Sequence, residues 1–250
     1  MPTFEVFRYN PETDENAYFQ EYNIPERKGM TVLEGLYYIL ENLESTLAFR
    51  SSCRQGVCGS CAMHINGMYR LACETQVEKM GERVIVRPLA HMKIIRDMVV
   101  DMDPFFAQYE KIKPYLIPAE LPGEREFLQT PKQRSKIDHH VDCILCAACY
   151  GSCPVVATDE KYIGPHALMK ALRFVDDSRD GATGERLALV ATDEGVFRCH
   201  TIFNCQQVCP KDLNPTGAIG KLKMKSIWAK FTGGMKKTGE TLSKSRIGIF

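Results

Sequence analysis

The chain has 250 residues, of which 44% are hydrophobic and 25% are charged, and its formal net charge is +1. These fractions are typical of a soluble globular protein, and the small net charge gives no reason to expect nucleic acid as a partner. Residues 1–10 lack the basic start and apolar core of a signal peptide. No run of about 18 apolar residues occurs that could span a bilayer. We therefore expect any association with a membrane to depend on a partner or on a surface helix.

The first hundred residues predict a small mixed α/β domain. Residues 4–9 and 18–24 have the composition of strands, and a polar turn joins them. Thr31 and Glu34 have the spacing of a capping box, which predicts the start of a helix. The apolar face of this helix contains Leu33, Leu36, Tyr37 and Leu40.

Further strands complete this domain. The dipeptide Asn66-Gly67 predicts a hairpin turn between strands at 62–65 and 68–72, and a short strand follows at 83–87. Two strands, a helix and further strands are typical of a β-grasp ferredoxin domain. The order of the strands in the sheet does not follow from this pattern.

A connector separates this domain from the rest of the chain. Five prolines interrupt residues 97–134, so only a short helix is predicted there, at 105–112. We place the domain boundary near Asp103. The predicted organisation is an N-terminal domain at 1–103, a helical domain at 104–230 and a basic tail at 231–250.

The second half of the chain has the pattern of helices. We predict helices at 132–149, 165–175 and 215–230, the last two beginning at a proline. Residues 176–194 are polar and contain glycine, which predicts a surface loop.

The 11 cysteines are the strongest functional signal. Without an export signal they are better interpreted as metal ligands than as disulfides, and their odd number argues against complete pairing. The first cysteine loop carries Cys53, Cys58 and Cys61. Gly56 and Gly59 in this loop would allow its backbone to approach a bound iron–sulfur cluster closely. A zinc site is the alternative, but zinc usually binds two separated Cys-x2-Cys pairs, which this loop lacks. The spacing of Cys53, Cys58, Cys61 and Cys73 is that of a plant-type 2Fe–2S site.

The second group begins with the spacing of a bacterial ferredoxin run, in which the fourth cysteine binds a neighbouring cluster. This run contains Cys143, Cys146, Cys149 and Cys153, followed by Pro154. Its counterpart contains Cys199, Cys205 and Cys209, followed by Pro210. Ile202 stands where the complete run has a cysteine, so one corner of a cubane would have no ligand. This substitution predicts a 3Fe–4S cluster.

In a crossed arrangement the last cysteine of each run binds the cluster of the other run, so every remaining cysteine is assigned to a cluster. Three clusters in one chain predict one-electron transfer, and no dinucleotide, P-loop or Ser/His/Asp motif is present. We therefore predict no catalytic residue in this chain and assign the conversion of substrate to another subunit. The predicted 4Fe–4S ligands are Cys143, Cys146, Cys149 and Cys209, and the predicted 3Fe–4S ligands are Cys153, Cys199 and Cys205.

This cysteine pattern resembles the iron–sulfur subunits of succinate dehydrogenase and fumarate reductase, the succinate:quinone oxidoreductases. The resemblance covers most of residues 1–225. It implies an α+β architecture, with an N-terminal β-grasp 2Fe–2S ferredoxin domain and a C-terminal all-helical ferredoxin domain. The matching stretches are CRQGVCGSCAMHINGMYRLAC, CILCAACYGSCP, YIGPHALMKALRF, DSRDG and CHTIFNCQQVCPKDLNPTGAIGKLK.

The resemblance also implies a function and partners. Electrons would pass one at a time between the FAD of a flavoprotein subunit, where succinate and fumarate interconvert, and quinone at a membrane-anchor subunit, which can carry haem b. The order of clusters would be 2Fe–2S, 4Fe–4S and 3Fe–4S. The chain would lie on the cytoplasmic face of the inner membrane, held there by the anchor. One alternative is the iron–sulfur electron-transfer subunit of a related fumarate reductase or heterodisulfide-type enzyme that uses a soluble or thiol partner. Outside redox chemistry, the alternative is a zinc-stabilised interaction module.

The sequence departs from the family pattern on the quinone side. Many family members have a tryptophan shortly after the Cys-Pro pair and a serine next to that proline, whereas this chain has Val155, and Trp228 is its only tryptophan. The position of the quinone site is therefore open. The residues that correspond to the quinone side of the family are Pro154, His200 and Ile202.

The chain from Lys221 onward is basic and contains interleaved apolar residues such as Trp228 and Phe231. This pattern predicts an amphipathic contact with anionic headgroups or with the anchor subunit. The alternative interpretation is a solvated tail, which is the usual state of a charged run.

Overall fold

The computed structural model describes residues 1–119, 123 and 126–235, so most of the predicted tail at 231–250 lies outside the described residues. The predicted boundary near Asp103 and the three predicted domain ranges remain predictions. Two compact units can be distinguished. One consists of Met1–Phe105, Ile144–Ser152 and Gln207–Asp212, and the other consists of Phe106–Cys143, Cys153–Gln206 and the described part of Leu213–Phe250.

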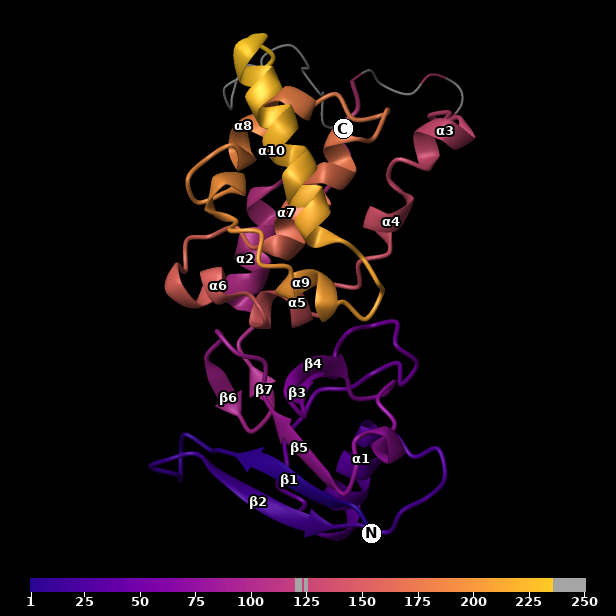
Figure 1. Cartoon of the computed structure of the whole chain (residues 1–250), viewed down its shortest axis with the longest axis vertical. Coiled ribbons are helices and arrows are strands. Elements are labelled where there is room, and N and C mark those ends of the chain that lie inside the picture. The colour runs from indigo at the N-terminus through magenta and orange to yellow at the C-terminus, as the bar shows by residue number, and fades with distance from the viewer. Residues whose placement is uncertain (120–122, 124–125, 236–250) are drawn as a thin grey trace, which may run out of the picture. The chain divides into compact units, whose positions relative to one another are not determined.

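A five-stranded sheet forms the centre of the first unit, with the strand order β2-β1-β5-β3-β4 (Figure 1). β1 runs parallel to β5, and the other neighbouring strands are antiparallel. Buried and half-buried side chains alternate along β1, as expected for a strand with one face on the core. The strands are β1 (Thr3–Arg8), β2 (Tyr18–Asn23), β3 (Ala62–Ile65), β4 (Met68–Leu71) and β5 (Arg83–Arg87), and a separate two-stranded sheet contains β6 (Ile94–Arg96) and β7 (Val99–Val100).

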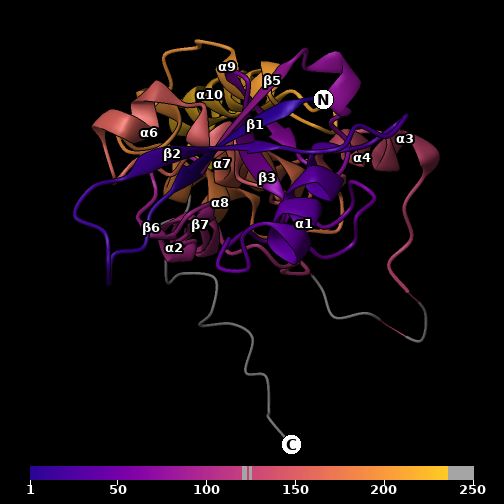
Figure 2. The same cartoon turned by 90° about the horizontal axis from the view of Figure 1, so that it is seen from below.

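Helix α1 (Val32–Asn42) packs against this sheet (Figure 2). The predicted capping box is confirmed, because the Thr31 hydroxyl accepts from the amide of Glu34 and the Glu34 carboxylate accepts from the amide of Thr31. Gly35 allows the close contact with β1, since a Cβ atom there would lie 2.4 Å from the Phe4 ring. The buried apolar face of α1 includes Leu33, Leu36 and Ile39.

Helices make up the second unit, and α7 (Pro165–Val175) is its buried centre. Helix α10 (Pro215–Phe231) packs along α7 and also contacts α8 (Thr183–Val190) (Figure 1). Both α7 and α10 begin at the predicted proline. The other helices of the chain are α2 (Asp103–Lys111), α3 (Pro131–Arg134), α4 (Asp138–Val141), α5 (Ala148–Gly151), α6 (Pro154–Thr158) and α9 (Asn204–Gln207), with short 3-10 turns at η1 (Val77–Lys79) and η2 (Val196–Arg198).

Two predictions of secondary structure were wrong. The continuous helix predicted at 132–149 is divided into α3, α4 and α5. Left-handed backbone angles at Leu145 and Ala147, with φ of 52° and 64°, separate α4 from α5. The surface loop predicted at 176–194 contains α8, with Glu185, Arg186 and Leu187 buried. The buried arginine explains this error, because its charge is neutralised by a partner outside the helix.

Arg186 connects α8 to the described part of the proline-rich connector. Its side chain is 1% exposed and forms two hydrogen bonds to the Asp180 carboxylate, of 3.1 and 2.7 Å. The same guanidinium donates to the backbone carbonyls of Ile112, Lys113 and Tyr115. A connector that lacks long helices is thereby fixed to the second unit by one buried cation.

We expect Asp180→Asn to lower the free energy of unfolding by about 3–5 kcal/mol, because it leaves the Arg186 guanidinium buried without its carboxylate. Urea denaturation followed by circular dichroism measures this change. Asp193→Asn is the matched control, because Asp193 is exposed and its replacement should change the free energy by less than about 0.5 kcal/mol. Equal effects of the two substitutions would contradict the role of the buried pair.

Candidate iron–sulfur centres

Backbone amides of the loop before β3 donate hydrogen bonds to the sulfur atoms of Cys53 and Cys73. The Sγ atom of Cys53 accepts hydrogen bonds from the amides of Val57 and Cys58, at 3.3 and 3.2 Å. The Sγ atom of Cys73 accepts from the amide of Gly56 at 3.3 Å. Amide donors around thiolates stabilise negative charge on an iron–sulfur cluster and help to set its potential. The donor set of this loop therefore fits the predicted 2Fe–2S cluster.

Left-handed backbone conformations bend this loop around the sulfurs. Arg54, Gly56 and Gly59 have φ angles of 58°, 68° and 73°. A Cβ atom on Gly59 would lie 2.8 Å from the Cβ atom of Cys146 and 3.0 Å from the carbonyl oxygen of Ile144. The segment Ile144–Ser152, which belongs to the first unit, thus lies directly against the loop, and only glycine fits between them.

The thiols of this group differ in their environments. Burial raises the pKa of the Cys61 thiol to about 12. A hydrogen bond with the Ser60 side chain is the main cause that lowers the pKa of the Cys58 thiol to about 6. Bound iron would offset the negative charge of a buried sulfur, because a coordinating thiol is deprotonated outright. The burial of Cys61 is thus compatible with a cluster ligand.

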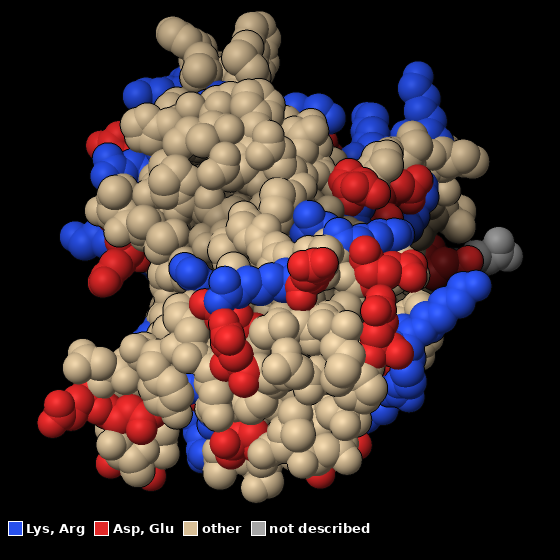
Figure 3. Space-filling view, turned by 60° about the horizontal axis from the view of Figure 1, so that its bottom comes forward, with Lys and Arg blue, Asp and Glu red and all other residues tan. Residues whose placement is uncertain are grey.

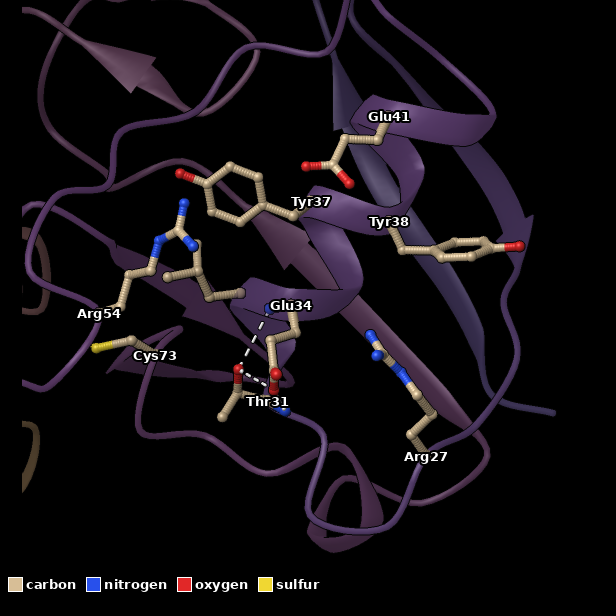
Figure 4. Close-up of a pocket in the computed structure, with 9 residues that line it drawn as sticks. Arg27, Thr31, Glu34, Tyr37, Tyr38, Glu41, Arg54 and Cys73 are labelled. Carbon is tan, nitrogen blue, oxygen red and sulfur yellow. Dashed lines mark hydrogen bonds between the residues drawn. The ribbon is translucent and has the colours of Figure 1, made fainter.

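A pocket of about 460 Å³ opens beside Cys73, and Figure 4 shows the side chains that line it. The Arg54 guanidinium lies 4.5 Å above the ring of Tyr37. A hydrogen bond from the Thr31 amide is the main cause that lowers the pKa of Glu34. This carboxylate therefore serves the helix cap, and the pocket presents charged and aromatic groups next to the cluster loop.

The two later cysteine runs share a backbone pattern. In the first run, Leu145 and Ala147 have left-handed φ angles on either side of Cys146. In the second run, Thr201 and Phe203 have φ angles of 58° and 71° on either side of Ile202. Each pattern leads into a short helix, α5 in the first run and α9 in the second. Ile202 thus has the same local backbone setting as Cys146.

The structure brings together the three cysteines predicted to bind the 3Fe–4S cluster. Cys153, Cys199 and Cys205 line one cavity in the second unit. The hydroxyl of Thr216 and the Sγ atom of Cys205 are 3.2 Å apart and form a buried hydrogen bond. Burial raises the pKa of the Tyr162 phenol, whose side chain lies beside the same three thiols.

The four cysteines predicted to bind the 4Fe–4S cluster are divided between the two compact units. Cys146, Cys149 and Cys209 belong to the first unit, where their segments Ile144–Ser152 and Gln207–Asp212 are found, whereas Cys143 is the last residue of its segment in the second unit. Cys209 is therefore grouped with Cys146 and Cys149 and not with Cys205, its neighbour in the sequence. None of these ligand assignments is tested directly, and they remain predictions.

The three predicted quinone-side residues line the same cavity as Cys153. Pro154 and His200 are exposed, and Ile202 is 48% exposed. Phe203, which is 49% exposed, belongs to this wall but was not predicted from the sequence. Thr216 was also missed, because a threonine in the first turn of a helix gives no sign that its hydroxyl will contact a cysteine.

The described residues contain neither a membrane-spanning helix nor a site for a single metal ion. None of the helices in the described ranges is both long and apolar enough to cross a membrane. Within the same part of the chain, no three histidine, cysteine, aspartate or glutamate side chains are placed to hold a single metal ion.

Residues 3–107 match a family model described as a 2Fe-2S iron-sulfur cluster binding domain, and residues 140–213 match one described as a 4Fe-4S dicluster domain. The succinate dehydrogenase iron–sulfur subunit of Coxiella burnetii is 44% identical over 228 residues, which cover 90% of this chain and 97% of that protein. The chain belongs to the family of succinate dehydrogenase iron–sulfur subunits.

Other similar proteins support the same family and fold. The mitochondrial succinate dehydrogenase [ubiquinone] iron–sulfur subunit of Dictyostelium discoideum is 44% identical over 231 residues, covering 88% of this chain and 80% of that protein. A chain of the Mycobacterium smegmatis Sdh1 complex in the apo form superposes with a TM-score of 0.82 at 26% identity, over 92% of this chain and 97% of that one. The predicted family and α+β fold class are confirmed. This iron–sulfur subunit is an electron-transfer component of an oxidoreductase, with 2Fe–2S and 4Fe–4S ferredoxin domains.

We expect Gly59→Ala to lower the 2Fe–2S content of this iron–sulfur subunit and to destabilise it. The left-handed φ of 73° costs alanine about 1–2 kcal/mol, and the collision with Cys146 adds about 1–3 kcal/mol. Gly67→Ala is the matched control, because Gly67 has φ of 82° but nothing within 4 Å of an added Cβ. Iron and sulfide analysis with urea denaturation separates the two. The same loss of cluster in both variants would mean that backbone strain alone acts.

Proposed function

We propose that this subunit conducts electrons from the FAD of a flavoprotein partner to a quinone held at a membrane-anchor partner. The proposed path is 2Fe–2S, then 4Fe–4S, then 3Fe–4S, since each such centre passes single electrons. The proposal includes haem b in the anchor and a position on the cytoplasmic face of the inner membrane. The observation that carries it is the repeated backbone pattern in which Ile202 takes the setting of Cys146.

The ligand sets of the two later clusters have independent support. A crossed arrangement requires the last cysteine of each run to approach the other run. Cys209 lies in the same unit as Cys146 and Cys149, and Cys153 lines one cavity with Cys199 and Cys205. The proposed 2Fe–2S ligands are Cys53, Cys58, Cys61 and Cys73, the proposed 4Fe–4S ligands are Cys143, Cys146, Cys149 and Cys209, and the proposed 3Fe–4S ligands are Cys153, Cys199 and Cys205.

Each end of the proposed path has an accessible surface. At the 2Fe–2S end, the pocket beside Cys73 offers charged and aromatic groups to a flavoprotein (Figure 4). At the 3Fe–4S end, the exposed Ile202 and Phe203 form an apolar wall, and the exposed His200 offers a proton donor. An apolar wall with one polar group suits a quinone ring. Val155 is buried and occupies the position of the family serine, so His200 is the polar side chain that we assign to the quinone.

The test of the three-iron assignment is Ile202→Cys. A fourth thiolate in the setting of Cys146 should retain a fourth iron, because it completes the ligand set of a cubane. The expected result is loss of the oxidised three-iron EPR signal and a rise from about nine to about ten irons per chain, on the three cluster types proposed.

Phe203→Cys is the matched control for this experiment. It adds the same thiol one residue later, at a position whose counterpart in the first run is Ala147. We expect the three-iron signal to persist in this variant. Conversion by both variants, or by neither, would overturn the assignment of Ile202 to the vacant ligand position.

Thr216 should tune the potential of the proposed 3Fe–4S cluster. Its hydroxyl bonds the Sγ atom of Cys205, and such hydrogen bonds favour the more negative, reduced cluster. We expect Thr216→Val, which keeps the shape of the side chain, to lower the potential by about 30–60 mV, the equivalent of about 1 kcal/mol for one electron. Redox titration followed by EPR measures the shift. Thr158→Val removes a hydroxyl whose partners, among the described residues, are the backbone carbonyls of Pro154 and Val155, and it should leave the potential unchanged.

A further inference from the structure

Helix α10 has apolar side chains on two opposite faces. One face packs into the second unit through residues that include Ile219, Leu222 and Ala229. With about 100° per residue, the opposite face is centred roughly 180° from Leu222. That face contains Met224, Ile227, Trp228 and Phe231, which are 69%, 41%, 72% and 85% exposed.

The spacing of these four residues distinguishes them from ordinary surface apolar residues. Single exposed apolar side chains are normal on a folded protein and need no explanation. The four residues of α10 instead follow the i, i+3, i+4, i+7 pattern of one helical face. The set also includes a tryptophan and a phenylalanine, two large aromatic side chains. A contiguous outward face of this kind indicates a surface that another apolar phase covers.

Lysines border this face on both sides. By the same helical geometry, Lys223 and Lys230 lie along one edge, and Lys221 and Lys225 lie along the other. Lys223 also donates to the carbonyl of Cys199, and Lys225 pairs with Asp176 at 2.9 Å. Lys221 and Lys230 are exposed.

The charged side chains of the helix itself have one sign, and the acidic Asp176 that pairs with Lys225 comes from outside α10. Residues 213–239 contain no aspartate or glutamate. Acidic and basic side chains are interspersed, by contrast, on the surface that Figure 3 shows. A protein partner with a mixed surface would match such a segment poorly, whereas phosphate groups above an apolar layer match both the lysines and the stripe between them.

We propose that the outward face of α10 lies in the plane of a membrane surface that contains anionic phospholipid. Met224, Ile227, Trp228 and Phe231 insert below the headgroups, and Lys221 and Lys230 contact the phosphates. This arrangement combines the two contributions to interfacial binding, namely buried apolar area and attraction to anionic lipid. The inference depends on α10 alone and not on any cluster assignment.

The only tryptophan of the chain, Trp228, reports directly on this face. The experiment uses the full-length chain, with its clusters assembled anaerobically, and vesicles of equal parts phosphatidylglycerol and phosphatidylcholine. We expect the emission of Trp228 to shift to the blue and to be quenched by brominated acyl chains. Phosphatidylcholine vesicles at about 0.15 M salt should give neither effect, because the attraction to anionic headgroups is then missing.

Two sets of variants test the two contributions. Ile227→Ser with Phe231→Ser should weaken vesicle binding by about tenfold or more. Lys221→Gln and Lys230→Gln should each weaken it by about fivefold. Leu43→Ser and Leu128→Ser are the matched controls, because both leucines are exposed and lie outside α10, and they should bind as the unchanged chain does. The cluster absorption spectrum verifies that every variant is folded.

An unchanged Trp228 emission with anionic vesicles would overturn the proposal. The same holds if both vesicle types give equal shifts, or if the control variants lose as much binding as the α10 variants. If the emission shifts only when a detergent-solubilised membrane protein is added, the face is a protein interface and the lipid proposal is wrong.

Discussion

The need to converge several sulfurs on one inorganic centre determines the unusual backbone of this chain. A helix or strand cannot bring three or four cysteines within a few residues to one point, so the loops adopt left-handed conformations. Non-glycine residues hold them at Arg54, Leu145, Ala147, Thr201 and Phe203. Each such conformation costs of order 1 kcal/mol or more and persists only where its surroundings require it. Among the described residues, these five are half of the ten non-glycine residues with positive φ, although the three cysteine loops are a small part of the chain. This share connects the strain to the proposed cluster sites.

The same constraint explains why the compact units do not follow the sequence. The segments Ile144–Ser152 and Gln207–Asp212 belong to the first unit, although the chain around them belongs to the second. Both carry cysteines assigned to one cluster. The proposed crossed ligation offers a physical reason why these two segments are grouped together, because a shared cluster would hold them more firmly than a few apolar contacts. Cys143, which is assigned to the same cluster, is grouped with the second unit.

The sequence predicted the family, the two ferredoxin domains and the starts of several helices better than it predicted the structure between the cysteine runs. Cysteine spacing is a chemical requirement and can be read locally, and so can the capping box at Thr31 and the prolines that begin α7 and α10. Helix α8 was missed because Arg186 is polar and nothing in the local sequence marks it as buried. Its carboxylate partner Asp180 lies six residues earlier, and its carbonyl partner Ile112 lies in a distant segment. The break between α4 and α5 was missed because alanine and leucine favour helix, so nothing local in the sequence predicts the left-handed φ angles of Leu145 and Ala147.

Helix α10 connects the proposed electron exit to the proposed membrane contact. Thr216 and Ile219, near its first turn, line the cavity of Cys153 and Cys199, and Phe231 ends the helix. Seventeen residues of helix span about 25 Å. A lipid contact along the outer face would therefore fix the height and tilt of the cavity above the membrane. Electron transfer to a quinone depends on the distance between the cluster and the quinone. Helix α10 can therefore both line the proposed 3Fe–4S cavity and set the distance of that cavity from the quinone in the membrane.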